Sequence, residues 1–524
     1  MPRNGPRPLN WKTGVGLVVA GALQTLTFSP FQWWWLGPIS LLLVLYLCLP
    51  LERSHMGRAG WLMGLGLFGS GASWVYISIH TYGMASAPLG ALLTLIFIAG
   101  LALFPTLAFW LWGRLACQST AARLVIFPGI WVLADWLRSW FLTGFPWLYL
   151  GTAQVDGPLG SWAPVLGVHG VTFLIAASAT TLFATILYGR AQARTVAAGT
   201  AALTLLPWLG AWPLANVEWT EKADQPLDFV TVQGDIPQII KWDPDHLRQQ
   251  LTVYLDLTEP FWNKDLILWP ETAIPLPSPS AGPIMDLIEE KLAGKGNALV
   301  TGIPWYGFSV EQGRRTYHNS MVVLGNGSGY YHKQRLVPFG EYVPLQDWLR
   351  GLIAFFDLPM SEFSRGPADQ QALQVAGHDV VTLICYEIAY PDFAAREARH
   401  SDYLITVSND AWFGDSIGPL QHLQIARMRA LETGRYLLRG TNNGVTALVD
   451  PRGRVTERAP RFERTVMEGQ LYPVTGMTPF MITTSWPVLG VSLLLVLAGA
   501  WQARRGQDSS VSAECGQRAV TRSK

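Results

Sequence analysis

Three side chains of types that support acyl transfer stand at the ends of strand-like runs in one polar segment of the chain. Glu271 follows the apolar run 266–269, Lys333 opens a Pro/Gly-rich loop, and Cys385 follows the run 380–384. Acyl transfer through a thiol needs a base for the thiol proton and a cation or other donor for the developing oxyanion. A glutamate, a lysine and a cysteine can fill these roles if the fold brings them together.

Cys385 is the only cysteine of this polar segment, so it cannot form a disulfide within it. Cys48 and Cys117 lie near the ends of hydrophobic stretches, and Cys515 lies in the polar tail. By position alone, a lone thiol at a strand end is more often an inert core residue than a nucleophile. Glu271 could equally be a surface charge at a strand end, and Lys333 could equally be a salt-bridge partner. Their joint occurrence at three strand ends favours catalysis.

The elements that must position these residues follow an α/β pattern across 215–479. Helical patterns near 243–255 and 420–433 alternate with strand-like runs, and Gly434 is a typical helix stop. The runs are 228–233, 266–269, 298–303, 321–324, 380–385, 403–408 and 445–449. Such alternation predicts a layered α/β or α+β domain. Without a GxGxxG after a strand, a P-loop or a CxxC pair, we expect no cofactor and no metal.

The rest of the chain has the composition of a membrane protein. Half of the 524 residues are hydrophobic and only 14% are charged, against about a quarter charged in soluble domains. The net charge of +1 gives no reason to expect nucleic acid as a partner. Apolar stretches predict about eight spans, at 14–27, 36–49, 60–79, 89–111, 124–142, 165–187, 196–212 and 486–501. We therefore expect a seven-span region at 1–214, a domain at 215–479, a final helix at 480–503 and a disordered tail at 504–524.

The placement of cations predicts the orientation of these spans. Arg and Lys residues occur before the first span, in every second loop and after the last span, whereas the alternate connections carry none. The cationic side of a membrane protein is cytoplasmic. Both termini and the tail should therefore be cytoplasmic, and 215–479 should lie in the periplasm of a bacterium.

Three motifs resemble the Glu-Lys-Cys pattern of the nitrilase, or carbon–nitrogen hydrolase, superfamily. They are Trp-Pro-Glu at 269–271, His-Lys-Gln-Arg-Leu-Val-Pro-Phe-Gly-Glu at 332–341 and Ile-Cys-Tyr-Glu at 384–387. The flanking motifs at 232–244, 408–432 and 441–444, with seven spans before the domain and one after it, are similar to the bacterial apolipoprotein N-acyltransferase family along nearly the whole chain. Asp135 is a small departure, since the resemblance favours Glu there.

The resemblance implies a polytopic α-helical membrane protein of the bacterial inner membrane with an inserted αββα sandwich domain. It implies transfer of an acyl chain from a phospholipid, typically the sn-1 chain of phosphatidylethanolamine, to the N-terminal amine of a diacylglyceryl-modified apolipoprotein. This would be the last step of lipoprotein maturation. Cys385 would carry the acyl group as a thioester, Glu271 would act as the base, and Lys333 would stabilise the oxyanion.

Other residues have a candidate role beside a structural explanation. Glu341 would orient Lys333 or the incoming amine, or form a loop salt bridge, and Tyr386 and Glu387 would shape the pocket beside the nucleophile. Three aromatic residues, Trp242, Trp412 and Phe413, are candidates for contact with lipid or for a mobile lid. Their presence would also be explained by packing at the membrane interface, where aromatic residues are common.

Arg138, at the outer end of the fifth span, forms an i, i+3 ion pair with Asp135 or contacts the donor's phosphate.

Two other functions remain open from the sequence. A membrane-tethered amidase or nitrilase would use the same three residues. A non-catalytic transporter or lipid-binding scaffold would instead show charged or broken helices within the membrane, and the predicted spans contain few charges.

Overall fold

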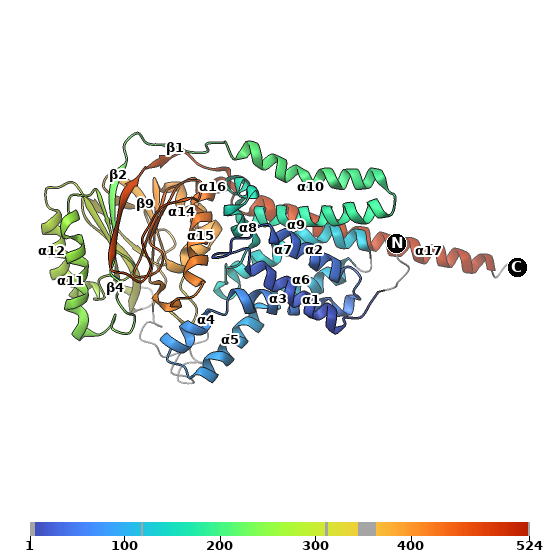
Figure 1. The fold of residues 1–524 in the computed structure, drawn as a ribbon, viewed down its shortest axis with the longest axis horizontal. Coiled ribbons are helices and arrows are strands. Elements are labelled where there is room, and N and C mark those ends of the chain that lie inside the picture. The colour runs from blue at the N-terminus through green and yellow to red at the C-terminus, as the bar shows by residue number, and fades with distance from the viewer. Residues whose placement is uncertain (1–5, 117–118, 310–312, 344–362, 522–524) are drawn as a thin grey trace. The chain divides into compact units, whose positions relative to one another are not determined.

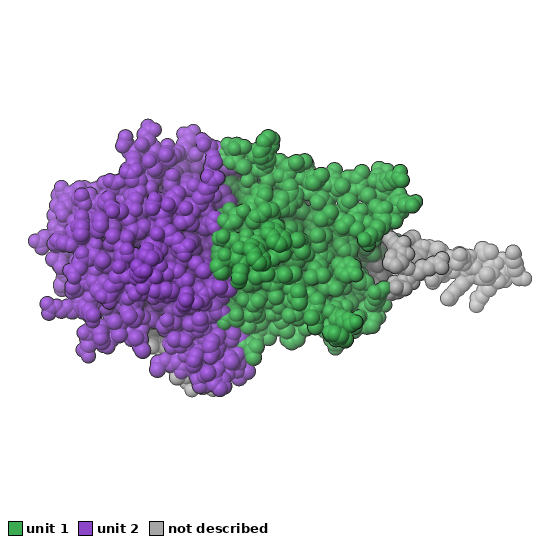
Figure 2. Space-filling model, in the orientation of Figure 1, with its two compact units in different colours: residues 1–73, 95–217, 485–524 green, residues 74–94, 218–484 purple. Residues whose placement is uncertain are grey.

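The computed structural model describes residues 6–116, 119–309, 313–343 and 363–521. By its internal contacts the chain forms two compact units, shown in two colours in Figure 2. Unit 1 comprises Met1–Ser73, Leu95–Val217 and Ser485–Lys524, and unit 2 comprises Trp74–Thr94 and Glu218–Thr484. Cys117, singled out in the sequence, lies outside the described residues.

Unit 1 is helical, and one helix lies along each predicted span except the third, which is bent, and the fourth, which two consecutive helices share. The helices are α1 (Trp11–Thr25), α2 (Leu36–Cys48), α3 (Met56–Gly71), α6 (Leu103–Leu115), α7 (Thr120–Trp140), α8 (Leu150–Ala153), α9 (Ala163–Arg190), α10 (Arg194–Leu214) and α17 (Trp486–Thr521), joined by α5 (Ala87–Leu101), which begins in unit 2. Among the described residues, five helices are long and apolar enough to cross a membrane, or six if the pair Arg53–Gly71 and Val75–Tyr82, bent by 63°, counts as one.

The predicted membrane architecture is confirmed, and its count of eight spans is approximate. α1 and α2 have 15 and 13 residues, fewer than the roughly 20 that a span perpendicular to the bilayer needs. α17 continues to Thr521, and the prediction of a disordered tail at 504–524 stays a prediction.

Unit 2 contains two large β-sheets, visible in Figure 1. The six-stranded sheet has the order β14 (Thr465–Leu471), β2 (Leu227–Gln233), β3 (Leu266–Leu268), β4 (Ala298–Ser309), β5 (Arg314–Gly325) and β7 (Tyr330–His332). The seven-stranded sheet has the order β13 (Val455–Arg458), β12 (Ala447–Val449), β11 (Leu437–Thr441), β10 (Tyr403–Ser408), β9 (His378–Ile384), β8 (Leu373–Val375) and β6 (Gly327–Ser328). A two-stranded sheet pairs β1 (Glu221–Lys222) with β15 (Val474–Thr475).

The alternation of side chains along β3 explains the layering of unit 2. Leu266 and Leu268 belong to the apolar core that both sheets share, whereas Ile267 and Trp269 belong to a second core with α11 (Leu247–Thr258) and α12 (Gly282–Leu292). On the other sheet lie α14 (Pro391–Glu397) and α15 (Gly418–Thr433), as Figure 1 shows. The expected αββα sandwich is confirmed.

Parallel pairing brings the chemistry-bearing residues to one edge of the sandwich. β2, β3 and β4 are parallel in one sheet, and β9, β10 and β11 are parallel in the other. Ile384 pairs with Val407, so the next residues along the two strands, Cys385 and Ser408, are neighbours. The carboxyl ends of parallel strands share one edge, where pockets form.

Segment Trp74–Thr94 packs with the α/β unit, although the sequence placed it at the end of a span and in the following loop. It contains α4 (Val75–Ile77) and a π-helical turn, Ser78–Tyr82. Its Trp74 ring meets the Phe413 ring edge-on with centroids 4.9 Å apart. The Ser78 hydroxyl donates to the Trp412 carbonyl at 2.8 Å. The segment therefore supports the loop that follows β10.

Candidate active site

Cys385 lies at a sharp turn between β9 and a short 3₁₀ helix, Cys385–Ala389. Its φ angle is +51°, in the left-handed region that side-chain-bearing residues rarely adopt. Burial and the charge of Glu271 raise the pKa of the thiol to about 12, and Lys333 opposes this. Cys385 therefore rests as a thiol, and its ionisation would need a base.

Glu271 is held by donors on both carboxylate oxygens. Oε1 accepts from the Asn319 amide at 2.7 Å, and Oε2 accepts from the backbone N–H of Asn409 at 2.8 Å. Asn409 directly follows the end of β10, so the second sheet contributes to fixing a carboxylate that extends from the first. The buried carboxylate has a defined orientation and can take a proton at this site.

Lys333 follows β7 and is almost completely buried, with 1% of its side chain exposed. Its Nζ lies 2.8 Å from Oε1 of Glu341 and 3.6 Å from Oε1 of Glu271. Burial alone lowers the pKa of Lys333, but the two carboxylates outweigh it and raise this pKa above the ordinary value. The ammonium is therefore a permanent cation in the site.

Glu341 closes a network that the sequence did not reveal in full. It accepts from Lys333, from the Asn319 amide at 3.0 Å and from the Val337 backbone N–H at 2.8 Å. Asn319 thus donates to both glutamates. It was missed because an asparagine in a strand gives no motif; its only signal is a polar residue just before the apolar run 321–324.

Glu387 is fully buried, and its carboxylate is held by four hydrogen-bond donors. It accepts from the Tyr331 hydroxyl and from the backbone N–H groups of Gln334, Arg335 and Ile384. Burial raises the pKa of Glu387 to about 7, although the hydrogen bonds from these donors lower it. The carboxylate therefore connects the loop that begins at Lys333 to the turn that holds Cys385.

The remaining predicted residues of unit 2 lie around these groups. Tyr386 is 9% exposed and packs edge-on against Tyr390. Trp242 is half-buried, and its indole N–H has no hydrogen-bond partner among the described residues. Trp412 and Phe413 pack on Tyr82 and Trp74 of segment Trp74–Thr94. The two rings therefore contact this segment.

Lys241, within the flanking motif at 232–244, is a second buried lysine. Its Nζ donates to the backbone carbonyl of Glu271 at 3.0 Å. Burial lowers the pKa of Lys241 to about 8, although Glu271 and Cys385 oppose this. The signal in the sequence was a lone lysine between the apolar Ile240 and Trp242.

Four further residues form a buried polar cluster beside Cys385 that sequence reasoning did not identify. Ser408 Oγ lies 3.4 Å from Cys385 Sγ and also donates to Asp410. Arg439 pairs with Asp410 at 2.8 Å, and His422 Nε2 lies 3.0 Å from the Cys385 carbonyl oxygen. The motifs at 408–414 and 421–432 contained Ser408, Asp410 and His422, but spacing could not show that they meet.

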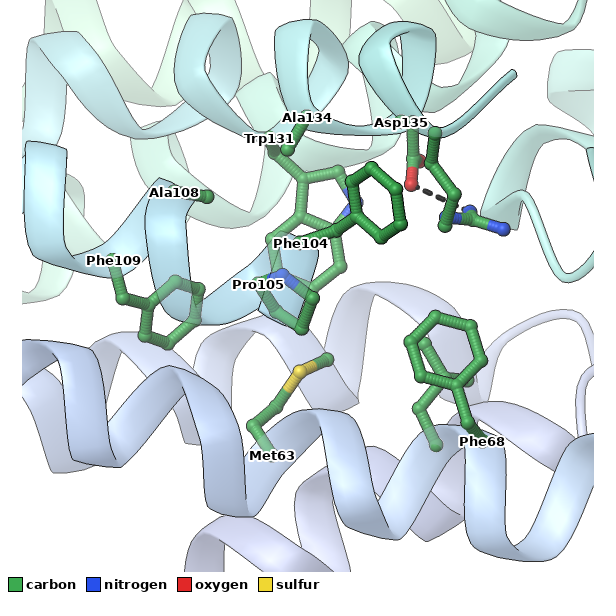
Figure 3. A pocket seen from close by; sticks show the side chains of 11 residues that line it. Met63, Phe68, Phe104, Pro105, Ala108, Phe109, Trp131, Ala134 and Asp135 are labelled. Atoms are coloured by element: carbon green, nitrogen blue, oxygen red, sulfur yellow. Dashed lines mark hydrogen bonds and ion pairs between the residues drawn. The ribbon is translucent and has the colours of Figure 1, made fainter. Parts of the chain in front are cut away.

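Arg138 and Asp135 belong to unit 1. Arg138 donates to Asp135 at 2.8 Å and to the backbone carbonyls of Phe145 and Trp147. The pair lines one end of a small pocket of about 30 Å³ (Figure 3). The other lining residues are apolar: Met63, Leu67, Phe68, Phe104, Pro105, Ala108, Phe109, Trp131 and Ala134.

The described part of the chain contains no group of three or more His, Cys, Asp or Glu side chains that could hold a metal ion. The groups available at this edge of the sandwich are a thiol, a fixed carboxylate and an ammonium. Such a set can transfer an acyl group through a covalent intermediate.

Comparisons with known proteins agree along nearly the whole chain. Residues 20–181 match the family described as apolipoprotein N-acyltransferase N-terminal domain, and residues 231–475 match the carbon-nitrogen hydrolase family. The apolipoprotein N-acyltransferase of Pseudomonas syringae pv. tomato is 47% identical over 490 residues, which cover 93% of this chain and 96% of that protein. Those of Azotobacter vinelandii (48%; 93% and 94% covered) and Coxiella burnetii (38%; 92% and 98% covered) are similar over the same extent.

Proposed function

The chain belongs to the apolipoprotein N-acyltransferase family, and from this premise we propose how its side chains carry out the reaction. It is an acyltransferase of the membrane, with a lipid donor and a lipoprotein acceptor. Our proposal is that the donor is a phospholipid, chiefly the sn-1 chain of phosphatidylethanolamine. The acceptor is the N-terminal amine of a diacylglyceryl-modified cysteine of an apolipoprotein.

In the first half-reaction, Glu271 takes the proton of the Cys385 thiol, and the thiolate attacks the ester carbonyl of the phospholipid. The negative charge that develops on the carbonyl oxygen is stabilised by Lys333. The intermediate collapses when Glu271 returns the proton to the departing alkoxide. A lysophospholipid leaves, and the acyl group remains on Cys385 as a thioester.

In the second half-reaction, the free amine of the lipoprotein attacks the thioester, and Lys333 again stabilises the oxyanion. Glu271 accepts the proton of the attacking amine, the amide forms, and the Cys385 thiolate leaves and recovers a proton. Water must be kept from the thioester during this exchange. The burial of Glu271 and Lys333 supports such exclusion.

The supporting residues have distinct proposed roles. Glu341 orients Lys333, which its 2.8 Å contact supports, and Glu387 fixes the turn of the nucleophile. Trp242 contacts the acyl chain. For Arg138 we favour the structural alternative, because its guanidinium already binds Asp135 and two backbone carbonyls.

Tyr386 forms a wall of the pocket beside the nucleophile. Trp412 and Phe413 shape the loop after β10 through their ring contacts with Tyr82 and Trp74.

We place the protein in the bacterial inner membrane, with unit 2 in the periplasm and both termini in the cytoplasm. The support is the distribution of cations in alternate loops together with the apolar helices. A periplasmic site would lie on the side where lipoproteins receive their last acyl chain.

One observation carries the catalytic assignment. A permanent ammonium lies 3.6 Å from a carboxylate at the strand edge that also holds the nucleophile turn, and both charges act on the pKa of Cys385. A membrane-tethered amidase would share this set, so only the acceptor separates the two functions.

The test is an intact-mass measurement on the full chain, purified in detergent and incubated with phosphatidylethanolamine. We expect a hydroxylamine-labile acyl adduct on the wild type and none on Cys385→Ala, while Cys48→Ala, a change at a buried cysteine of unit 1, keeps it. A diacylglyceryl lipopeptide should then discharge the adduct as an amide. Consumption of phospholipid without amide product would identify a hydrolase, and no consumption would indicate a scaffold.

A further inference from the structure

Ser408 is the last residue of β10 and lies beside the nucleophile in the neighbouring strand. The register pairs Val407 with Ile384, and the hydroxyl oxygen of Ser408 lies 3.4 Å from Cys385 Sγ. The Ser408 side chain is completely buried, so solvent does not compete for its hydrogen bonds. The hydroxyl therefore has a small and defined set of partners.

A serine hydroxyl has one hydrogen, and here two acceptors lie within its reach. One is Oδ1 of Asp410 and the other is the sulfur of Cys385. The hydroxyl can donate to only one of them at a time. While Cys385 is a thiol, a carboxylate is the stronger acceptor, so the hydroxyl donates to Asp410.

Asp410 is held as an anion by its other neighbours. Burial by itself raises the pKa of Asp410, but the Arg439 guanidinium at 2.8 Å and the contacts with His422 and Ser408 lower it well below the ordinary value. A carbonyl oxygen only accepts, so His422 Nε2 carries the hydrogen that is donated to the Cys385 carbonyl at 3.0 Å. The cluster therefore fixes both the backbone and the sulfur of the nucleophile.

We propose that Ser408 is a positioning residue whose hydroxyl changes its acceptor during catalysis, from Asp410 to the Cys385 sulfur when the thiolate forms. No covalent bond changes at Ser408: its proton stays on Oγ and only the Cβ–Oγ bond rotates. The thiol proton goes to Glu271, as in the reaction above. When sulfur is acylated and neutral, the hydroxyl returns to Asp410. This inference rests on the proposed role of Cys385 as nucleophile.

Other charged or titratable groups also face the sulfur or its backbone, and the test must separate Ser408 from them. They come from every element around the turn: Lys241, Glu271, Lys333, Asp410 and His422. Among these contacts, the hydrogen bond from Ser408 lowers the pKa of the thiol, whereas the charge of Asp410 raises it. Ser408 and Asp410 therefore act on the thiolate with opposite sign.

The experiment measures the rate at which iodoacetamide alkylates Cys385 in the full chain in detergent, from pH 7 to 11, by peptide mass. For Ser408→Ala we expect the pKa of the Cys385 thiol to rise by about one unit. At each pH below the midpoint of the thiol titration, alkylation should then be roughly ten-fold slower. Ser408→Thr keeps a hydroxyl and should restore most of the rate. Thr406→Val is the matched control, because the Thr406 hydroxyl on the same strand donates to the Leu383 carbonyl and not to sulfur.

Asp410→Asn gives a second test of opposite sign, because it removes the charge and replaces the competing carboxylate with a neutral, weaker acceptor. Alkylation should become faster, and slower or unchanged alkylation overturns the proposal, as does a wild-type rate in Ser408→Ala. In acyl transfer, Ser408→Ala should slow adduct formation and leave the KM for the lipopeptide unchanged. If alkylation of wild-type Cys385 leaves acyl transfer intact, the proposed nucleophile is wrong instead, whatever the variants do.

Discussion

The ammonium of Lys333 lies 2.8 Å from Oε1 of Glu341. It is farther, 3.6 Å, from Glu271, so the two carboxylates near this lysine are not equivalent. Glu341 is the ion-pair partner, and Glu271 has its own donors in Asn319 and the Asn409 backbone. This division leaves Glu271 available for proton transfer, and it gives the two glutamates different expected phenotypes.

Glu271→Gln should have opposite effects on two reactions of the same thiol. Loss of the base should slow acyl-adduct formation by roughly 10²–10⁴-fold. Alkylation by iodoacetamide should instead become faster, because the charge of Glu271 raises the pKa of Cys385. Both rates can be read from the mass of the protein, and Lys333→Met should slow both. Equal slowing of both rates in Glu271→Gln would contradict the assignment of Glu271 as the base.

Glu341→Gln should slow adduct formation more than tenfold, because Lys333 would then turn to Glu271 and occupy the proton acceptor. Loss of one partner of a buried ion pair should also lower the free energy of unfolding by roughly 3 kcal/mol. Glu259→Gln is the matched control, since Glu259 pairs with Lys291 on the surface at 3.0 Å and exposed pairs contribute little. Similar losses in the two variants would argue against a special role for Glu341.

Lys241 should make the stability of the protein depend on alkaline pH. Burial lowers its folded-state pKa from 10.5 to about 8, so between these values the unfolded chain binds more protons than the folded chain. The unfolding free energy should therefore rise with pH across this window, by about 3 kcal/mol in total. Thermal unfolding of wild type and Lys241→Met at pH 7 to 10.5 tests this. As pH rises, the unfolding free energy of the wild type should increase relative to that of Lys241→Met.

Trp74→Ala should loosen the loop that carries Asp410. Trp74 donates to the side chain of Gln421 at 3.1 Å and packs edge-on against Phe413, contacts worth together about 1–3 kcal/mol. Hydrogen exchange should accelerate in 410–414 and remain unchanged in β2. Trp11→Ala, at an exposed tryptophan of unit 1, is the control. Unchanged exchange in 410–414 would show that segment Trp74–Thr94 does not support this loop.

Arg138→Gln distinguishes a structural arginine from a phosphate contact. Because Arg138 binds Asp135 and two backbone carbonyls, we expect a lower melting temperature and an unchanged KM for phospholipid. The exposed Arg114, changed to Gln, should alter neither. A raised KM with a normal melting temperature would favour the phosphate contact.

Several features of this protein could be predicted from the sequence because they depend on local composition and periodicity. The apolar stretches, the alternating strands and helices and the three motifs indicated a membrane protein with an inserted αββα domain, and the structure and the comparisons confirm this. The number of spans was only approximate, because a bend of 63° and two short helices depend on packing between helices. The roles of Glu271, Lys333 and Cys385 stay predictions.

The sequence could not show which side chains from different strands and from the two sheets come into contact. Asn319 donates to two glutamates that stand 70 residues apart in the chain, and Ser408 meets Cys385 only through the register of β9 with β10. Segment Trp74–Thr94 joins the α/β unit although its sequence continues a span. Sequence patterns report neighbours along one strand or helix, whereas these contacts arise from pairing and packing between distant elements, which only the tertiary structure determines.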